Sequence, residues 1–264
     1  MKTFKIIAAG VSGLIVAGSV MISCTKNVQE ATALKDDFSN NAIVQLYVAT
    51  VNASRNYVYV DAQALNGSSL SSGSVFPGTG YGFNVGTGFR GFTVRDTLST
   101  TTQVPLTFAQ NFQGGKSYTV FTYDTITNPK QKTVETLIDV PTDTTARIRF
   151  GYFTYSPNDV PAVDIFSVKR KANIFSNVML TDVTDFVPIA SGITDTLFVR
   201  LAGSGVNLQN FRPATPTVPA GFVDISAIIT PTIRRSYTLV FRGGFRASAT
   251  NNATVRTLSV FINR

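Results

Sequence analysis

The segment Ala146-Arg147-Ile148-Arg149-Phe150-Gly151-Tyr152 decides the fold, because apolar residues alternate along it with charged or small ones. A period of two places every second side chain on one face of a strand, whereas a helix repeats about every 3.6 residues. One apolar face and one polar face are typical of an antiparallel strand that is buried on one side. The pattern therefore predicts a half-buried antiparallel strand over residues 146–152.

The same alternation recurs along the rest of the chain. Further strands are expected around residues 44–48, 197–201 and 223–229. Clusters of Gly, Pro, Asn and Ser separate these segments, as turns require, and Thr, Val, Phe and Tyr dominate between them. Almost no stretch shows a helical period. We therefore predict an all-β fold.

Two parts of the chain carry corresponding segments. Their first strands are Ala42-Ile43-Val44-Gln45-Leu46 and Ala146-Arg147-Ile148-Arg149-Phe150, and Tyr118-Thr119 later corresponds to Tyr237-Thr238. The spacing grows from 104 residues (146 minus 42) to 119 (237 minus 118), so the second copy has about 15 additional residues. We expect these additional residues in the Pro-rich segment 209–220.

Each copy has the size of a β-sandwich domain of ~100 residues. Pro141 and Asp143, among several Thr residues, interrupt the strand pattern between the copies. We therefore predict two tandem antiparallel β-sandwich domains, the first over residues 42–140 and the second over residues 146–264.

The start of the second copy contains further distinctive residues. An Arg-bearing strand is followed by the turn Ser156-Pro157-Asn158-Asp159-Val160-Pro161, by a strand with Val163-Asp164, and later by Tyr237-Thr238. This order resembles the bacterial family called domain of unknown function 4397. In the first copy, residues 52–56 stand at the place of the turn and both prolines are absent. The resemblance implies immunoglobulin-like sandwiches, often in tandem, in envelope or extracellular proteins, and it supplies no catalytic residues.

Polar residues of this motif have structural interpretations. Ser156 is suited to bond the backbone of its own turn. Asp164 lies on the strand face opposite Val163 and Ile165, and we expect its carboxylate to accept N–H groups from the adjoining loop. The alternative for Asp164 is a contact to a cation or a ligand.

The first 24 residues read as a targeting segment. Lys2 and Lys5 precede 18 uncharged residues, Ile6–Ser23, which is typical of a secretory signal peptide. Cys24, the only Cys, follows directly, and the arrangement resembles a bacterial lipobox of the loose type found in the Bacteroidetes, with Met21 where the motif usually has Leu. We predict a lipoprotein signal peptide over residues 1–23 and acylation of Cys24. The alternative is an uncleaved membrane anchor.

Residues 24–41 are predicted to be the lipidated Cys and a flexible tether, because small polar residues dominate and little can be packed there. An acyl chain on Cys24 would hold the protein on a membrane through its buried CH₂ groups. Lys35-Asp36-Asp37 is similar to an acidic signal for the outer face of the membrane. We expect an outer-membrane lipoprotein of the cell envelope and leave its periplasmic or surface-exposed face open.

Composition argues against catalysis. The chain has no His and one Cys, so Ser-His dyads, His metal ligands and Cys-based zinc sites are excluded. Only Glu30 and Glu135 are Glu, and no carboxylate pair for glycoside hydrolysis is identifiable. Asp182 and Asp185 are interpreted as solvated loop charges, with a weak calcium site as the alternative. We expect a protein without catalytic residues, cofactor or metal.

Positive charge is concentrated in the second copy. Residues 146–264 contain 13 basic and 6 acidic residues, which gives +7 of the net +8. Arg forks bind carboxylates and phosphates bidentately, so such a surface suits acidic glycans or lipopolysaccharide. A solubilising surface is the alternative. The candidate anion-binding residues are Lys169, Arg170, Lys171, Arg234, Arg235, Arg242 and Arg246.

These observations predict a non-enzymatic envelope lipoprotein that acts as a binding, adhesion or scaffolding module. Its expected partners are the membrane, through the lipid anchor, and a glycan, lipopolysaccharide or another envelope protein; nucleic acid is not expected. The alternative is a carbohydrate-binding accessory lipoprotein of a polysaccharide-uptake system, although the chain lacks the Trp that often forms a sugar platform.

Replacing the proposed acylation site tests the targeting prediction. Cys24→Ala removes the only thiol that could be acylated, so we expect an unlipidated precursor that retains residues 1–23. Metabolic labelling with palmitate and intact-mass measurement compare this variant with the unsubstituted chain. Normal lipid labelling of Cys24→Ala would refute the prediction.

Overall fold

Strands, with the turns and irregular loops that join them, make up nearly all of the chain that the computed structural model describes, which comprises residues 38–78, 80–138 and 141–263. The one helical element in these residues is a short 3-10 turn, η2 (Phe38–Asn40). Among them, no helix has the length and apolar character needed to span a bilayer. The all-β prediction is confirmed. The predicted signal peptide, Cys24 and tether residues 25–37 lie outside the described residues. Residues 38–41, predicted to end the flexible tether, instead form η2 and the first residue of β1.

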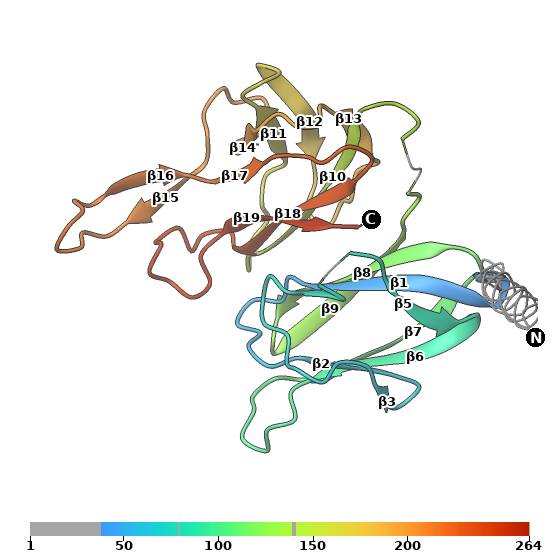
Figure 1. Cartoon of the computed structure of the whole chain (residues 1–264). Helices are drawn as coiled ribbons and strands as arrows, with labels where there is room; N and C mark the ends of the chain where they lie inside the picture. The colour runs from blue at the N-terminus through green and yellow to red at the C-terminus, as the bar shows by residue number, and fades with distance from the viewer. Residues whose placement is uncertain (1–37, 79, 139–140, 264) are drawn as a thin grey trace, which may run out of the picture. The chain divides into compact units, whose positions relative to one another are not determined.

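The N-terminal half consists of two sheets (Figure 1). The first sheet has the order β4-β1-β8-β9, with β5 also paired to β1, and the second has the order β3-β2-β6-β7. The strands of the first sheet are β1 (Asn41–Val48), β4 (Val75–Phe76), β5 (Phe83–Gly86), β8 (Ser117–Thr125) and β9 (Asn128–Glu135). Those of the second sheet are β2 (Tyr57–Val60), β3 (Gln63–Ala64), β6 (Gly88–Arg95) and β7 (Leu106–Phe112).

The C-terminal half repeats this plan. Its sheets have the orders β13-β10-β18-β19 and β12-β11-β14-β17, and a separate hairpin, β15–β16, extends away from the other strands of this half (Figure 1). The strands of the first sheet are β10 (Ala146–Tyr155), β13 (Val187–Ile189), β18 (Ser236–Gly244) and β19 (Thr257–Ile262). The remaining strands are β11 (Val163–Ser167), β12 (Ala172–Val178), β14 (Asp195–Leu201), β17 (Ser226–Ile229), β15 (Gln209–Arg212) and β16 (Gly221–Asp224).

The first strand of each half has neighbours in both directions. As predicted, β1 is antiparallel to β4 and β5, and β10 is antiparallel to β13, but β1 is parallel to β8 and β10 is parallel to β18, which was not predicted. Val44 of β1 is the register partner of Tyr118 in β8, and Ile148 of β10 is the partner of Tyr237 in β18. Parallel partners need a long crossover connection. Here the strands β2–β7 lie between β1 and β8, and the strands β11–β17 lie between β10 and β18. The alternation in a single strand carries no information about the direction of its partner, so this feature could not be read from residues 146–152.

Both tyrosines also make the same local bond. The hydroxyl of Tyr118 accepts the backbone N–H of Gln113 at 3.2 Å, and that of Tyr237 accepts the N–H of Thr232 at 2.9 Å. In each case the donor lies five residues before the tyrosine. The segments that correspond in sequence thus occupy the same register and make the same contact.

The longer connection of the C-terminal half lies between β14 and β17. Residues 96–105 join β6 to β7, whereas residues 202–225 join the equivalent strands β14 and β17 and contain the β15–β16 hairpin. The additional residues therefore lie where the Pro-rich segment was expected. The single strand predicted over residues 223–229 is wrong, because it is divided between β16 of the hairpin and β17 of the sheet.

An apolar core fills the space between the two sheets of each half. Val44, Leu46, Phe92 and Val120 belong to the N-terminal core, whereas the larger C-terminal core is formed by β10, β11, β14 and β18 with their neighbours. A sheet packed against another sheet buries one face in this way. The structure is consistent with a β-sandwich in each half.

A third apolar cluster lies between the halves. Tyr47 and Phe121, from β1 and β8, pack with Phe153, Val240 and Phe261 of the C-terminal half, and the rings of Phe121 and Phe153 stack at 4.6 Å. The central strands are consequently buried on both faces rather than half-buried as predicted. The covering residues belong to the other half, 32 positions away for Phe121 and Phe153 (153 minus 121) and 214 for Tyr47 and Phe261 (261 minus 47), where local alternation could not reveal them.

Removing Phe153 tests this third cluster as a core. Phe153→Ala deletes a fully buried ring, so we expect the free energy of unfolding to fall by about 3–5 kcal/mol. Denaturant titration of the protein measures the change. The matched control is Phe89→Ala, because Phe89 is 78% exposed. Equal effects of the two substitutions would contradict a packed interface between the halves.

Candidate anion-binding site

Five of the seven predicted cations lie on exposed turns at one end of the C-terminal half. Lys169, Arg170 and Lys171 form the turn between β11 and β12, and Arg234 and Arg235 precede β18. We call these five residues the basic end. Within the part of the chain that the structure describes, none of them forms an ion pair.

Strand pairing brings these two turns to the same end. The Arg170 guanidinium donates to the carbonyl of Pro188 in β13, and Pro188 is the register partner of Arg147 in β10. The backbone N–H of Arg147 in turn donates to the carbonyl of Arg235 at 2.9 Å. Successive elements therefore connect the Lys169–Lys171 turn to Arg235.

A buried carboxylate holds the Lys169–Lys171 turn in place. Asp195 accepts the backbone N–H of Lys169 at 3.0 Å and the hydroxyl of Ser167 at 2.5 Å. The Ser167 hydroxyl also accepts the N–H of Arg170 at 3.0 Å. The Asp195 carboxylate thus accepts hydrogen bonds from the turn and forms no ion pair with its cations. The three cationic side chains remain exposed.

The other two predicted residues lie elsewhere. Arg242 is half-buried in β18, where its Nε donates to Ser259 at 3.1 Å and its Nη1 donates to Ser72 of the N-terminal half at 3.2 Å. Arg246 is exposed on the connection between β18 and β19, at the opposite end of the sheet. Neither residue belongs to the basic end. Arg234 and Arg235 precede β18, whereas Arg242 lies near its far end and Arg246 follows it, so the length of the strand separates them.

Sequence reasoning missed the cation with the most unusual surroundings. Arg149 of β10 is only 3% exposed, and its guanidinium donates to the hydroxyls of Thr238 at 2.9 Å, Thr119 at 2.8 Å and Thr136 at 3.2 Å. Its guanidinium carbon also lies 4.7 Å from the centre of the Phe186 ring. Thr119 and Thr136 come from the N-terminal half, so Arg149 bonds both halves.

Burial changes the electrostatics of Arg149. Desolvation lowers the pKa of its guanidinium to about 9, because the charged form loses its hydration inside the protein. The group still carries a positive charge at neutral pH. The alternation of Arg147 and Arg149 with apolar residues indicated a polar face, but no local signal shows that another half of the chain covers it.

The structural interpretation of Asp164 is confirmed. Its carboxylate accepts the backbone N–H groups of Asn177 at 2.7 Å and Gly203 at 3.0 Å, and the side-chain amide of Asn173 at 2.9 Å. Ser156 likewise accepts the N–H of Asn158 in its own turn at 3.2 Å. The polar residues of the motif therefore hold loops rather than forming a reactive group.

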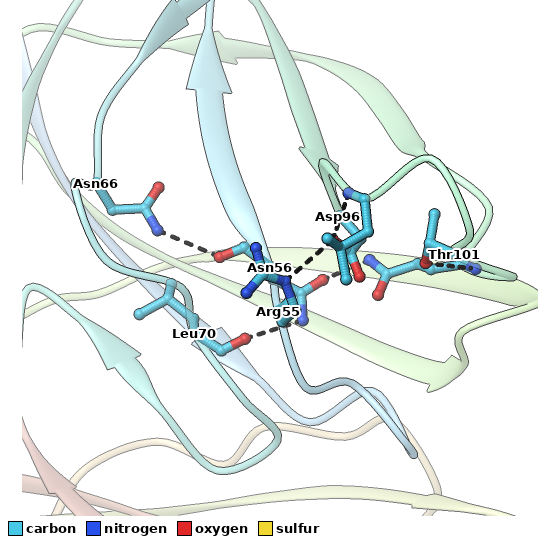
Figure 2. Close-up of polar contacts among 8 residues, drawn as sticks. Arg55, Asn56, Asn66, Leu70, Asp96 and Thr101 are labelled. Carbon is cyan, nitrogen blue, oxygen red and sulfur yellow. Dashed lines mark hydrogen bonds and ion pairs between the residues drawn. The ribbon is translucent and has the colours of Figure 1, made fainter.

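Polar contacts in the N-terminal half serve a comparable purpose where the turn motif is missing. Asn56 donates to the carbonyl of Leu70 at 3.1 Å, and its own carbonyl accepts the amide of Asn66 at 3.2 Å (Figure 2). Arg55 pairs with Asp96 at 3.4 Å, and the N–H of Leu98 is the main cause that lowers the pKa of Asp96. These groups satisfy one another across three segments, so we assign them to stability.

Within the ranges that the structure describes, no three His, Cys, Asp or Glu side chains gather as metal ligands would. Asp182, considered above for calcium, accepts the N–H of Met179 at 3.2 Å.

Comparison with known proteins adds no family or relative: no family model matches the chain, and no match to a curated protein was found. The resemblance to domain of unknown function 4397 therefore stays a prediction.

Asp164→Ala tests the loop-holding role. The substitution leaves two backbone N–H groups and one amide without their acceptor, so we expect the free energy of unfolding to fall by about 3 kcal/mol. Denaturant titration measures this change, with the exposed Asp159→Ala as a control of equal charge. A loss no larger than that of the control would argue against the role.

Proposed function

We propose that this protein is a non-enzymatic lipoprotein of the cell envelope that binds anionic polymers through the basic end of its C-terminal half. The observation that carries the proposal is the display of five unpaired, exposed cations on two neighbouring turns of a sheet framework. Binding residues on loops held by a rigid scaffold are a common way for β-proteins to act.

The fold proposed with this function is a tandem pair of immunoglobulin-like domains, residues 42–140 and 146–264. The shared strand order, the parallel first strand and the equivalent bonds of Tyr118 and Tyr237 support it. Such modules place loops at the two ends of each sandwich. The basic end would then be one loop cluster of the second domain.

Membrane attachment is proposed from the sequence. A signal peptide over residues 1–23, an acylated Cys24 and a tether to residue 37 would hold the folded part at the outer membrane. Because η2 and β1 occupy residues 38–41, the extended part would comprise residues 25–37 and, at ~3.3 Å per residue, would reach roughly 40–45 Å. That reach would let the basic end meet polymers beyond the headgroups of the membrane.

Electrostatics favours an anionic polymer over a neutral one. Like charges held on adjacent turns repel one another within the screening length of about 8–10 Å at physiological salt. A chain of carboxylates or phosphates relieves this repulsion and is gripped by the planar guanidinium groups of Arg170, Arg234 and Arg235. Acidic glycans and the phosphates of lipopolysaccharide share this chemistry.

Charge reversal at the basic end tests the function. Arg234→Glu with Arg235→Glu is expected to weaken binding of polygalacturonic acid and of purified lipopolysaccharide by roughly tenfold or more, because two attractive contacts become repulsive. Binding is measured by biolayer interferometry at low and at physiological salt, and higher salt should weaken it.

A charge-matched control separates local binding from net charge. Arg95→Glu with Arg246→Glu changes the net charge equally but affects exposed residues outside the basic end, and it should retain most of the binding. Absence of binding to either polymer at low salt would refute the proposal. Selective capture of neutral glycans would instead support the accessory protein of polysaccharide uptake.

A further inference from the structure

A pocket of about 270 Å³ lies where the two halves meet. The N-terminal half lines it with residues at the end of β9, and the C-terminal half lines it with residues of β10 and β18, Arg149 among them, and with the segment before β13. The charged, hydroxyl-bearing and aromatic residues of the lining that matter for binding are Glu135, Arg147, Arg149, Asp185, Phe186 and Ser236. The volume suits a molecule the size of a monosaccharide and excludes a folded polymer.

Arg149 reaches this pocket with an unused donor. Its Nε and Nη2 bond to threonine hydroxyls, whereas Nη1 makes no hydrogen bond to any residue that the structure describes. No carboxylate of those residues lies within ion-pair distance of the guanidinium. Buried charges in proteins are normally paired, because neutral hydroxyls only partly replace the lost hydration. Because Arg149 has only neutral partners, we expect an anion from outside the chain to balance its buried positive charge.

Two further donors lie beside Arg149. Arg147 lies two residues earlier on the same face of β10, and Ser236 of β18 is its register partner. The Arg147 guanidinium bonds to Thr145 and lies 3.7 Å from Asp143. The hydroxyl of Ser236 makes no hydrogen bond to the described residues and is free to donate into the pocket.

The two acids of the lining do not neutralise Arg149. Glu135 is paired with Lys116 at 3.0 Å. Asp185 is exposed at the rim and has no ion pair with the described residues. Its negative charge opposes an anion from the solvent side, which makes Asp185 a useful residue for a test.

We propose that this pocket binds a small oxyanion, a carboxylate or a phosphate or sulfate group, between Arg149, Arg147 and Ser236. The anion replaces the carboxylate partner that Arg149 lacks within the protein. Because Arg149 also bonds to Thr119 and Thr136, a bound anion strengthens the contact between the halves. The site is distinct from the basic end and does not depend on the proposed function.

Calorimetric titration of the full-length protein tests the proposal with four probes: acetate, glucuronate, inorganic phosphate and sulfate, at constant ionic strength set by chloride. We expect saturable binding of at least one probe and a rise in the thermal unfolding midpoint at saturating concentration. If only acetate and glucuronate bind, the site takes carboxylates. If only phosphate and sulfate bind, the site takes phosphate or sulfate groups.

Arg149→Met keeps an unbranched side chain but removes the charge, so small-anion binding should be lost. Arg246→Met removes an exposed charge outside the pocket and should leave binding unchanged. Arg149→Met should also retain polymer binding at the basic end, which separates this proposal from the proposed function. Equal anion binding in Arg149→Met and the unsubstituted chain would overturn the assignment.

Asp185→Asn provides a test that does not depend on a buried substitution. Removing the exposed rim charge lowers the repulsion felt by an entering anion, so affinity should rise roughly twofold to fivefold. An unchanged or weaker affinity would contradict the proposed position of the anion. Failure of all four probes to bind at millimolar concentration would refute the proposal as a whole.

Discussion

Burial of the strand pairs β1–β8 and β10–β18 on both faces is the constraint on which the rest of the structure depends. One face of each pair packs against the second sheet of its own half, and the other face packs against the other half through Tyr47, Phe121, Phe153 and their neighbours. Water is thereby excluded from two layers of backbone, whose N–H and C=O groups are satisfied by the ladders. The remaining strands and turns are held at the edges of this framework.

Polar groups inside the same framework must find partners there. Gln45 donates to the carbonyl of Ile262 and accepts the amide of Asn263, so one polar pair links the halves without charge. Arg149 meets threonine hydroxyls from both halves but no carboxylate. The first arrangement is complete within the chain, whereas the second leaves a positive charge that an external anion can balance. The same interface thus supplies stability and a candidate binding pocket.

Two acids of the C-terminal half are buried, whereas the cations of the basic end are exposed. Asp164 and Asp195 are buried and use their oxygens to hold loops by accepting N–H groups. Their charges are therefore unavailable to the cations on the turn that Asp195 supports. Lys169, Arg170 and Lys171 remain exposed as a result, and strand pairing places Arg234 and Arg235 at the same end. Asp195 thus stabilises the Lys169–Lys171 turn without forming an ion pair with its cations.

Local sequence patterns predicted most of the strands, the correspondence between the two halves and the acceptance of backbone N–H groups by Asp164, because alternation and motif residues can be read along the chain. The tertiary structure added that one of the donors to Asp164 is Gly203, 39 residues away. The tertiary structure alone decided the parallel pairing of the first strands, the second buried face and the burial of Arg149. Arg149 bonds to Thr238, 89 residues away, and to Thr119, 30 residues away, so no window around residue 149 contains its surroundings. Alternation distinguishes two faces of a strand, but only long-range packing decides whether the polar face meets water or another layer of protein.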